Sequence, residues 1–183
     1  MGIAGLSRAV FLDRDGVLND VRVADGVPHP PSRVEDLVIL PGVREACDVL
    51  RSAGYRLFSV TNQPDVARGA QSRERVEEMN ARIRDTLDLD GIAVCYHDDS
   101  DGCECRKPKP GLLLSIARDE GVDLDQSFMI GDRWRDVAAG HAAGCRAILI
   151  DRGYAEGHRC NPDWTVLDLR AASEVILSLQ RGS

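Results

Sequence analysis

Residues 9–18 (AVFLDRDGVL) constrain the fold of this chain most, because four apolar residues run directly into two carboxylates and a glycine. A short apolar run ended by turn residues predicts a buried strand. In a parallel α/β sheet, ligands bind at the carboxyl ends of the strands. Asp13 and Asp15 at such an end could act as nucleophile and proton carrier and offer oxygens to Mg²⁺. An acidic turn closing a strand would show the same residues, so the later strand ends must decide.

Strand-like and helix-like stretches alternate along the rest of the chain. Apolar runs predict further strands at residues 55–60, 92–96, 128–130 and 146–150, with a weak one near Val166. Helices are predicted over residues 43–53, from Ser72 to Leu87, from Pro110 to Gly121, from the turn at residues 131–132 to about Gly144, and over residues 171–179. This alternation predicts an α/β fold, a Rossmann-like three-layer α/β/α arrangement with a mainly parallel sheet.

Length and charge exclude several classes of protein. The 183 residues suit a single domain over residues 1–183, long enough to bury a real core. A net charge of −7 without a Lys/Arg cluster argues against a nucleic-acid partner. No apolar run approaches transmembrane length, and the first residues lack the layout of a secretory signal. We therefore expect a cytoplasmic protein with no membrane partner.

Residues 20–41 form a long connection directly after the acidic pair, and four of them are prolines. A connection of this length inside a domain is usually functional or loose. Its position predicts a flexible flap over the site.

Groups suited to phosphate follow three later strands. The second strand ends at Thr61, whose hydroxyl could bind a phosphoryl oxygen, and Lys107 lies in a proline-stiffened segment after the third. The fourth ends at Asp132, which could supply a carboxylate to Mg²⁺. Asp136, one helical turn later, could hold Lys107 or metal-bound water. Taken singly, these residues would also suit a polar turn, a solvated basic loop and acids favoured by a helix dipole.

A cysteine loop precedes the lysine. Cys95, His97, Cys103 and Cys105 form the pattern C-x-H-x₅-C-x-C. Three thiolates and one imidazole suit a closed tetrahedral structural Zn²⁺ site, held by a small loop over about residues 95–105. Such a metal would stiffen a loop too polar to build a core, and would position Lys107. The alternative is three reduced cysteines and a surface histidine.

The order D-x-D-G, strand-Thr, Lys and G-D-x-x-x-D resembles the haloacid dehalogenase (HAD) superfamily of phosphohydrolases over residues 9 to about 150. The resemblance implies that Asp13 is the nucleophile forming an aspartyl-phosphate and that Asp15 is the general acid/base. It implies that Thr61 and Lys107 hold phosphoryl oxygens. It also implies that Asp13, the backbone carbonyl of Asp15, and Asp132 bind Mg²⁺. Phosphoryl transfer depends chiefly on positioning and charge neutralisation, which suits these groups.

Three narrower features are similar to the heptose 1,7-bisphosphate and histidinol-phosphate phosphatases of that superfamily. They are Asp-Arg-Asp-Gly, Thr-Asn-Gln followed by Ala-Arg-Gly, and the cysteine loop before Arg-Lys-Pro-x-Pro-Gly. This resemblance implies a fold without a large cap domain and a small phosphorylated metabolite as partner. The substrate-binding residues are expected to be Asn62, Gln63, Arg68, Arg106 and Arg133.

The substrate stays open at this point. The three arginines could contact a second phosphate of D-glycero-D-manno-heptose 1,7-bisphosphate. Asp98, Asp99 and Asp101 could equally receive the amine of histidinol phosphate. A non-catalytic zinc-stabilised binding protein would be favoured by loss of an essential acid, and all three acids are present. We expect a monomer that hydrolyses the heptose bisphosphate to heptose 1-phosphate.

Overall fold

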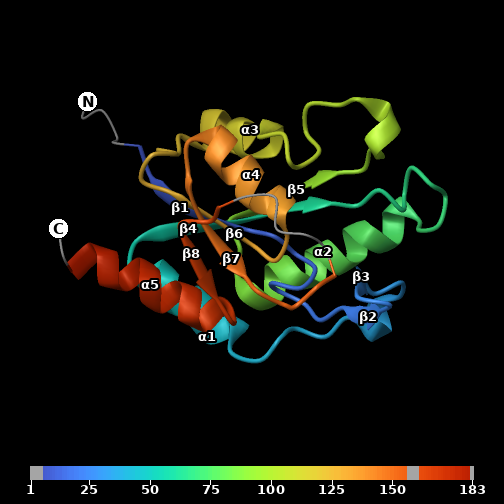
Figure 1. The fold of residues 1–183 in the computed structure, drawn as a ribbon, viewed down its shortest axis with the longest axis horizontal. Coiled ribbons are helices and arrows are strands. Elements are labelled where there is room, and N and C mark those ends of the chain that lie inside the picture. Colours follow the sequence, from blue (N-terminus) through green and yellow to red (C-terminus); the bar gives the residue numbers. More distant parts are fainter. Residues whose placement is uncertain (1–5, 156–160, 182–183) are drawn as a thin grey trace.

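A computed structural model describes residues 6–155 and 161–181. Its main sheet has six strands in the order β5-β4-β1-β6-β7-β8, all parallel to their neighbours (Figure 1). The strands are β1 (Arg8–Leu12), β4 (Tyr55–Asn62), β5 (Gly91–Cys95), β6 (Phe128–Gly131), β7 (Arg146–Ile150) and β8 (Trp164–Val166). The first strand of the chain is therefore central, and its apolar residues 9–12 are buried, as expected for a strand covered on both faces.

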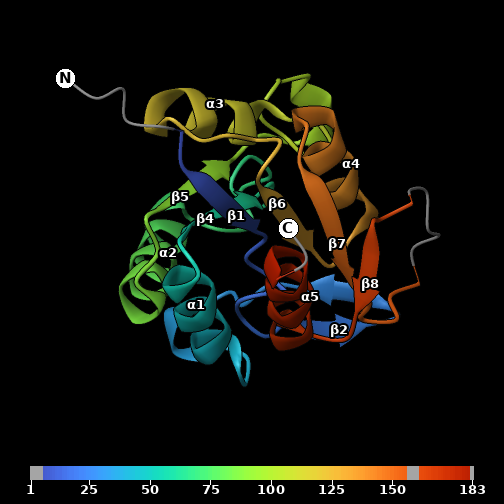
Figure 2. The same cartoon turned by 90° about the vertical axis from the view of Figure 1, so that its left-hand side faces the viewer.

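Helices cover both faces of this sheet, as Figure 2 shows. One layer holds α1 (Val43–Ser52), α2 (Arg73–Leu87) and α5 (Leu169–Arg181), and the other holds α3 (Gly111–Glu120) and α4 (Trp134–Ala143). Alternate residues of β1 pack against the two helical layers, since successive side chains of a strand point to opposite faces of the sheet. Val10 and Leu12 pack toward α1, α2 and α5, whereas Ala9 and Phe11 pack toward α3 and α4. The three-layer α/β/α prediction is confirmed.

Two of the differences between predicted and observed element boundaries have a clear physical cause. β4 continues to Asn62, because Thr61 and Asn62 pair with Val94 and Cys95 through their backbones, which their polar side chains do not hinder. α5 begins at Leu169, two residues early, where the Asp168 carboxylate accepts a hydrogen bond from the Ala171 N–H.

The connection after β1 contains structure that the sequence analysis did not predict. β2 (Arg22–Ala24) and β3 (Val27–His29) form an antiparallel hairpin, followed by the short helix η1 (Val34–Asp36). Asp25 and Gly26 turn between the strands with φ of 52° and 74°. An Asp-Gly pair is the strongest short-range hairpin signal, and it was available in the sequence. In Figure 1 this hairpin and the cysteine loop lie at the same end of the sheet.

The insertions within the described ranges are this hairpin and the cysteine loop with η2 (Asp99–Asp101), and no larger cap occurs there. No helix of the described chain combines the length and apolar character that a bilayer crossing requires. The assignment of residues 1–183 to one domain stays a prediction.

Candidate active site

A cavity of about 420 Å³ opens at the carboxyl ends of β1, β4 and β6. The predicted chemical groups come together in its lining: Asp13, Asp15, Thr61, Lys107, Asp132 and Asp136. The hairpin contributes Val27, Pro28 and His29 to the wall, and the loop after the cysteines contributes Arg106. Residues up to 123 positions apart in the chain thus face one cavity, because parallel strands end at a common edge.

Lys107 is the cation at the floor of this cavity. Its Nζ lies 2.8 Å from Asp13 Oδ1, 2.6 Å from Asp136 Oδ1 and 2.7 Å from the carbonyl oxygen of Val60. The Asn62 side chain holds the lysine's main chain, donating to its carbonyl and accepting from its N–H. Burial lowers the pKa of Lys107, but the charges of Asp13 and Asp136 outweigh it, so the pKa is raised and the amine stays charged.

Three buried acids crowd around that amine. Burial, followed by the charge of Asp136, raises the pKa of Asp13 to about 6, although Lys107 opposes the shift. Burial and the charges of Asp13 and Asp136 also raise the pKa of Asp132 well above its ordinary value. One lysine therefore does not balance the negative charge of this cluster.

The acid cluster fits a divalent cation. One carboxylate oxygen from each of Asp13, Asp132 and Asp136 lies within 4.8 Å of the others. Asp132 Oδ1 is buried and has no hydrogen-bond partner among the described residues. Asp136 is already engaged, by Lys107 through Oδ1 and by the Arg133 N–H through Oδ2. Hard oxygen donors with one unpartnered buried atom suit Mg²⁺, with Asp13 and Asp132 as the better-placed carboxylates.

Gly16 lets the first loop approach Asp132. Its φ is +84°, a conformation that favours glycine, and an added Cβ would lie 1.9 Å from Asp132 Oδ2. Tyr154, from the loop after β7, donates a hydrogen bond of 2.8 Å to the same oxygen. The glycine of D-x-D-G is therefore required by both turn geometry and space.

Asp15 lies only two residues after Asp13 but has different partners. Gln63 Nε2 donates to Asp15 Oδ2 at 2.7 Å and lies 2.9 Å from Thr61 Oγ1. The fully buried Arg14 pairs with the same carboxylate at 2.9 Å. Gln63 thus contacts Asp15 and Thr61, and Asn62 contacts the lysine loop.

The four cysteine-loop donors converge. Cys105 Sγ lies 3.2 Å from Cys95 Sγ and 3.5 Å from Cys103 Sγ, and His97 Nδ1 lies 3.3 Å from Cys105 Sγ and 3.6 Å from Cys95 Sγ. A tetrahedral zinc with ordinary bond lengths would place its sulfur ligands about 3.8 Å apart. The cluster therefore fits a structural Zn²⁺ with small adjustments.

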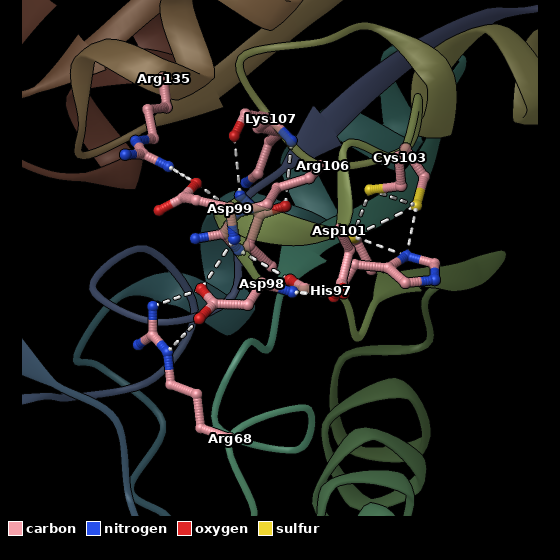
Figure 3. Close-up of polar contacts among 12 residues, drawn as sticks. Arg68, His97, Asp98, Asp99, Asp101, Cys103, Arg106, Lys107 and Arg135 are labelled. Carbon is pink, nitrogen blue, oxygen red and sulfur yellow. Dashed lines mark hydrogen bonds and ion pairs between the residues drawn. The ribbon is translucent and has the colours of Figure 1, made fainter.

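Arginines and aspartates pair at the rim, as Figure 3 shows. Asp99 Oδ1 lies 2.8 Å from Arg106 Nε and 2.9 Å from Arg135 Nη1, and these hydrogen bonds lower the pKa of Asp99. Arg68 pairs with Asp98 through two nitrogens, at 2.5 and 3.0 Å. The rim is thus a set of arginines held in place by acids of the cysteine loop.

Several residues of the site were missed from sequence. Arg14, Asn80, Arg135 and Tyr154 all contact predicted site residues or their partners. Arg135 could have been found, because it lies within the first turn of the helix that follows Asp132. Asn80 and Tyr154 carry no local signal, since each lies outside the strand-end motifs.

Replacing Asp132 with Asn should stabilise the Mg²⁺-free protein. The raised pKa means that the fold favours the protonated carboxyl. The contribution of Asp132 to the free energy of unfolding is therefore fully present below the ordinary pKa of an aspartate. It is lost as the pH rises through the raised pKa that Asp132 has in the folded protein. Asn does not ionise, so we expect a melting temperature at least about 3 °C higher at pH 7.5. The difference should vanish near pH 4.

Thermal melts in Mg²⁺-free buffer across pH 4–8 measure this effect. Asp85→Asn, an exposed acid on α2, is the matched control and should leave the melting temperature unchanged. A lower melting temperature for Asp132→Asn at pH 7.5 would contradict the conclusion that the acid cluster carries more negative charge than Lys107 can balance.

Comparisons with known proteins agree with this site. A family model described as HAD-hydrolase-like matches residues 104–172. The D-glycero-beta-D-manno-heptose-1,7-bisphosphate 7-phosphatase of Helicobacter pylori is 37% identical over 150 residues, covering 79% of this chain and 83% of that protein. The enzyme of the same name from Vibrio cholerae is 40% identical over 156 residues, covering 79% and 81%.

A solved structure extends the likeness to nearly the whole chain. The D,D-heptose 1,7-bisphosphate phosphatase of B. bronchiseptica, complexed with magnesium and phosphate, superposes with a TM-score of 0.81 at 31% identity. The match covers 94% of this chain and 99% of that one. This chain therefore belongs to the HAD-like hydrolases and is a phosphatase related to the D-glycero-beta-D-manno-heptose-1,7-bisphosphate 7-phosphatases.

Proposed function

We propose that this phosphatase hydrolyses D-glycero-D-manno-heptose 1,7-bisphosphate at the 7-phosphate and releases heptose 1-phosphate. The observation that carries the proposal is a cavity with cations at two depths. Lys107 lies beside Asp13 at the floor, and Arg106 and Arg135 lie around Asp99 at the rim. A substrate with two phosphates matches that arrangement, and relatives named for this substrate support it.

In the first step, an oxygen of Asp13 attacks phosphorus and the bond from phosphorus to the sugar oxygen breaks. Asp15 donates a proton to the departing oxygen. Thr61 and Lys107 hold the phosphoryl oxygens. In the second step, water attacks phosphorus, Asp15 takes its proton, and the bond to Asp13 breaks, which frees phosphate and restores both acids.

Mg²⁺ would be held by Asp13, Asp132 and the backbone carbonyl of Asp15, and when bound it would supply positive charge near the phosphoryl oxygens. Asp136 holds Lys107 in place. A structural Zn²⁺ on Cys95, His97, Cys103 and Cys105 would stiffen the loop that leads directly into Arg106 and Lys107.

Histidinol phosphate is the second candidate, and the rim argues against it. An amine would need spare acids at the mouth of the cavity. Asp98 and Asp99 are engaged by Arg68, Arg106 and Arg135, and Asp101 accepts a hydrogen bond from the Asp98 N–H. A non-catalytic binding role is disfavoured because Asp13, Asp15 and Asp132 all line the cavity. A cytoplasmic monomer stays a prediction.

A phosphate-release screen tests the substrate. The purified protein is assayed with the heptose bisphosphate, heptose 7-phosphate, other sugar phosphates and histidinol phosphate, each with and without Mg²⁺. We expect Mg²⁺-dependent release, with the bisphosphate giving the highest kcat/KM. A higher kcat/KM for histidinol phosphate would overturn the heptose assignment and leave the phosphatase chemistry standing.

Arg106→Lys should reduce kcat/KM for the bisphosphate more than for a monophosphate. Lysine keeps the charge but loses the planar fork that binds a phosphate through two nitrogens. The loss of one charge-assisted hydrogen bond to the outer phosphate should lower kcat/KM for the bisphosphate about tenfold or more. Steady-state kinetics on heptose 1,7-bisphosphate and heptose 7-phosphate measure the difference.

Arg118→Lys, an exposed arginine on α3, is the control and should change neither value. Equal losses on the two substrates for Arg106→Lys would place the outer phosphate elsewhere.

A further inference from the structure

The largest fully buried side chain among the described residues is a cation, Arg14, with no exposed surface. It lies between Asp13 and Asp15 in the loop that follows β1. A buried arginine that is not fully paired would be costly, so its partners indicate what it does. Nη1 donates to Asn80 Oδ1 on α2 at 2.9 Å. The remaining nitrogens face a single carboxylate, that of Asp15.

That carboxylate is held on both oxygens. Arg14 donates to Asp15 Oδ2 through Nε at 3.2 Å and Nη2 at 2.9 Å, and to Oδ1 through Nη2 at 3.0 Å. Asn19 Nδ2 donates to Oδ1 at 3.0 Å, and Gln63 Nε2 donates to Oδ2 at 2.7 Å. A carboxylate offers about four acceptor positions, so little freedom to rotate is left.

The charges around Asp15 explain why a cation is needed there. Asp13, Asp132 and Asp136 line the same cavity, and Lys107 is already shared between two of them. A fourth carboxylate without its own counter-ion would be repelled by the other three. Arg14 supplies that counter-ion from the core side, while the Asp15 side chain lines the cavity and keeps 17% exposure.

We propose that Arg14 is a positioning residue for proton transfer: through its two-nitrogen contact it fixes the orientation of the Asp15 carboxylate and balances its charge. The inference rests on the proposed role of Asp15 as the proton carrier. Arg14 itself has no contact with the reacting atoms, since it is buried behind the carboxylate. Asn80 holds the far side of the guanidinium and so ties the acid to α2.

Leaving-group dependence separates this role from a purely structural one. An alkyl phosphate needs a proton on its departing oxygen, whereas p-nitrophenolate leaves without one. Transfer of the phosphoryl group from p-nitrophenyl phosphate to Asp13 therefore does not need Asp15 as acid. Hydrolysis of the phosphorylated Asp13 still needs Asp15 as base.

Arg14→Lys, which keeps the charge and loses the fork, should lower kcat for the heptose bisphosphate about 100-fold, with KM changed less than threefold. The first turnover of p-nitrophenyl phosphate should stay within threefold of wild type. It should appear as a burst of about one nitrophenolate per chain before a slow steady state. Arg14→Gln should give the same pattern, and provides a second test if the lysine variant does not fold.

Arg56→Lys is the matched control, because Arg56 also pairs through two nitrogens, with Asp90 and Glu120, at the opposite end of β4. It should leave both reactions unchanged. In an Asp15→Asn background, Arg14→Lys should not reduce kcat for the heptose bisphosphate further, because the two residues act as one unit.

Three outcomes separate the proposals. Loss of alkyl phosphate turnover with the burst retained supports the role of Arg14. Equal losses in both reactions, or an unchanged kcat in the folded variants, would overturn it while the phosphatase function stands. A wild-type protein that releases no phosphate from any ester with Mg²⁺ would instead overturn the proposed function.

Discussion

Asp13→Asn should abolish phosphate release, with kcat reduced by more than about 10⁴-fold, because an amide cannot replace a carboxylate as nucleophile. The fold should persist. Ionised Asp13 is disfavoured by burial and by Asp136, so a neutral side chain relieves repulsion there. Lys107 keeps its contacts with Asp136 and the Val60 carbonyl.

Phosphate release and circular dichroism are measured on the same preparations. Radiolabelled phosphate from the substrate should be trapped on wild-type protein and absent from the variant. Asp48→Asn, an exposed acid on α1, is the control and should retain full activity. Near-normal turnover by a folded Asp13→Asn protein would refute the nucleophile assignment.

Purified protein should contain about one zinc per chain, and Cys103→Ser should lose it. Each structural ligand removed from a four-donor site leaves an open, weaker site. We expect the melting temperature to fall by about 10 °C. Structural zinc contributes several kcal/mol to the free energy of unfolding, and each kcal/mol corresponds to about 2–4 °C in a chain of this size. Turnover should fall as well, since the freed loop carries Arg106 and Lys107.

Elemental analysis and thermal melts decide this prediction. Cys145→Ala removes a buried cysteine of the α3–α4 core and should keep the zinc. Strong chelation should lower the melting temperature of wild type beyond the effect of withdrawing Mg²⁺. A metal-free protein with normal stability and activity would rule the site out.

The order of elements could be predicted because burial on both faces leaves a strong local pattern. β1 is apolar at every central position, since both layers of helices pack against it. The start of α2 could also be predicted from a local signal. Ser72 is a favoured N-cap residue, and its side chain accepts a hydrogen bond from the Arg75 N–H. The hairpin at residues 22–29 was missed although its Asp-Gly turn was visible, because the prolines around it indicated a loose connection.

The partners of the site residues could not be predicted in the same way. Asn62 and Gln63 were expected to bind substrate, which stays a prediction; both line the cavity, and their amides contact the main chain of Lys107 and the carboxylate of Asp15. The sequence left open whether Asp98 and Asp99 are spare acids, and the structure pairs them with arginines from three different segments. A motif specifies which chemical groups are available, but long polar side chains can reach several partners.

By itself, the sequence determined the α/β class, the strand ends that carry the acids and the lysine, and the four-donor cysteine loop. These follow from local hydrophobic pattern and short-range spacing, which one segment of chain can encode. Only the tertiary structure decided that Asn80 holds Arg14 against Asp15, that Tyr154 contacts Asp132, and that Asp99 joins Arg106 to Arg135. Those contacts join segments up to 66 residues apart, and their geometry depends on how two helical layers pack around one sheet.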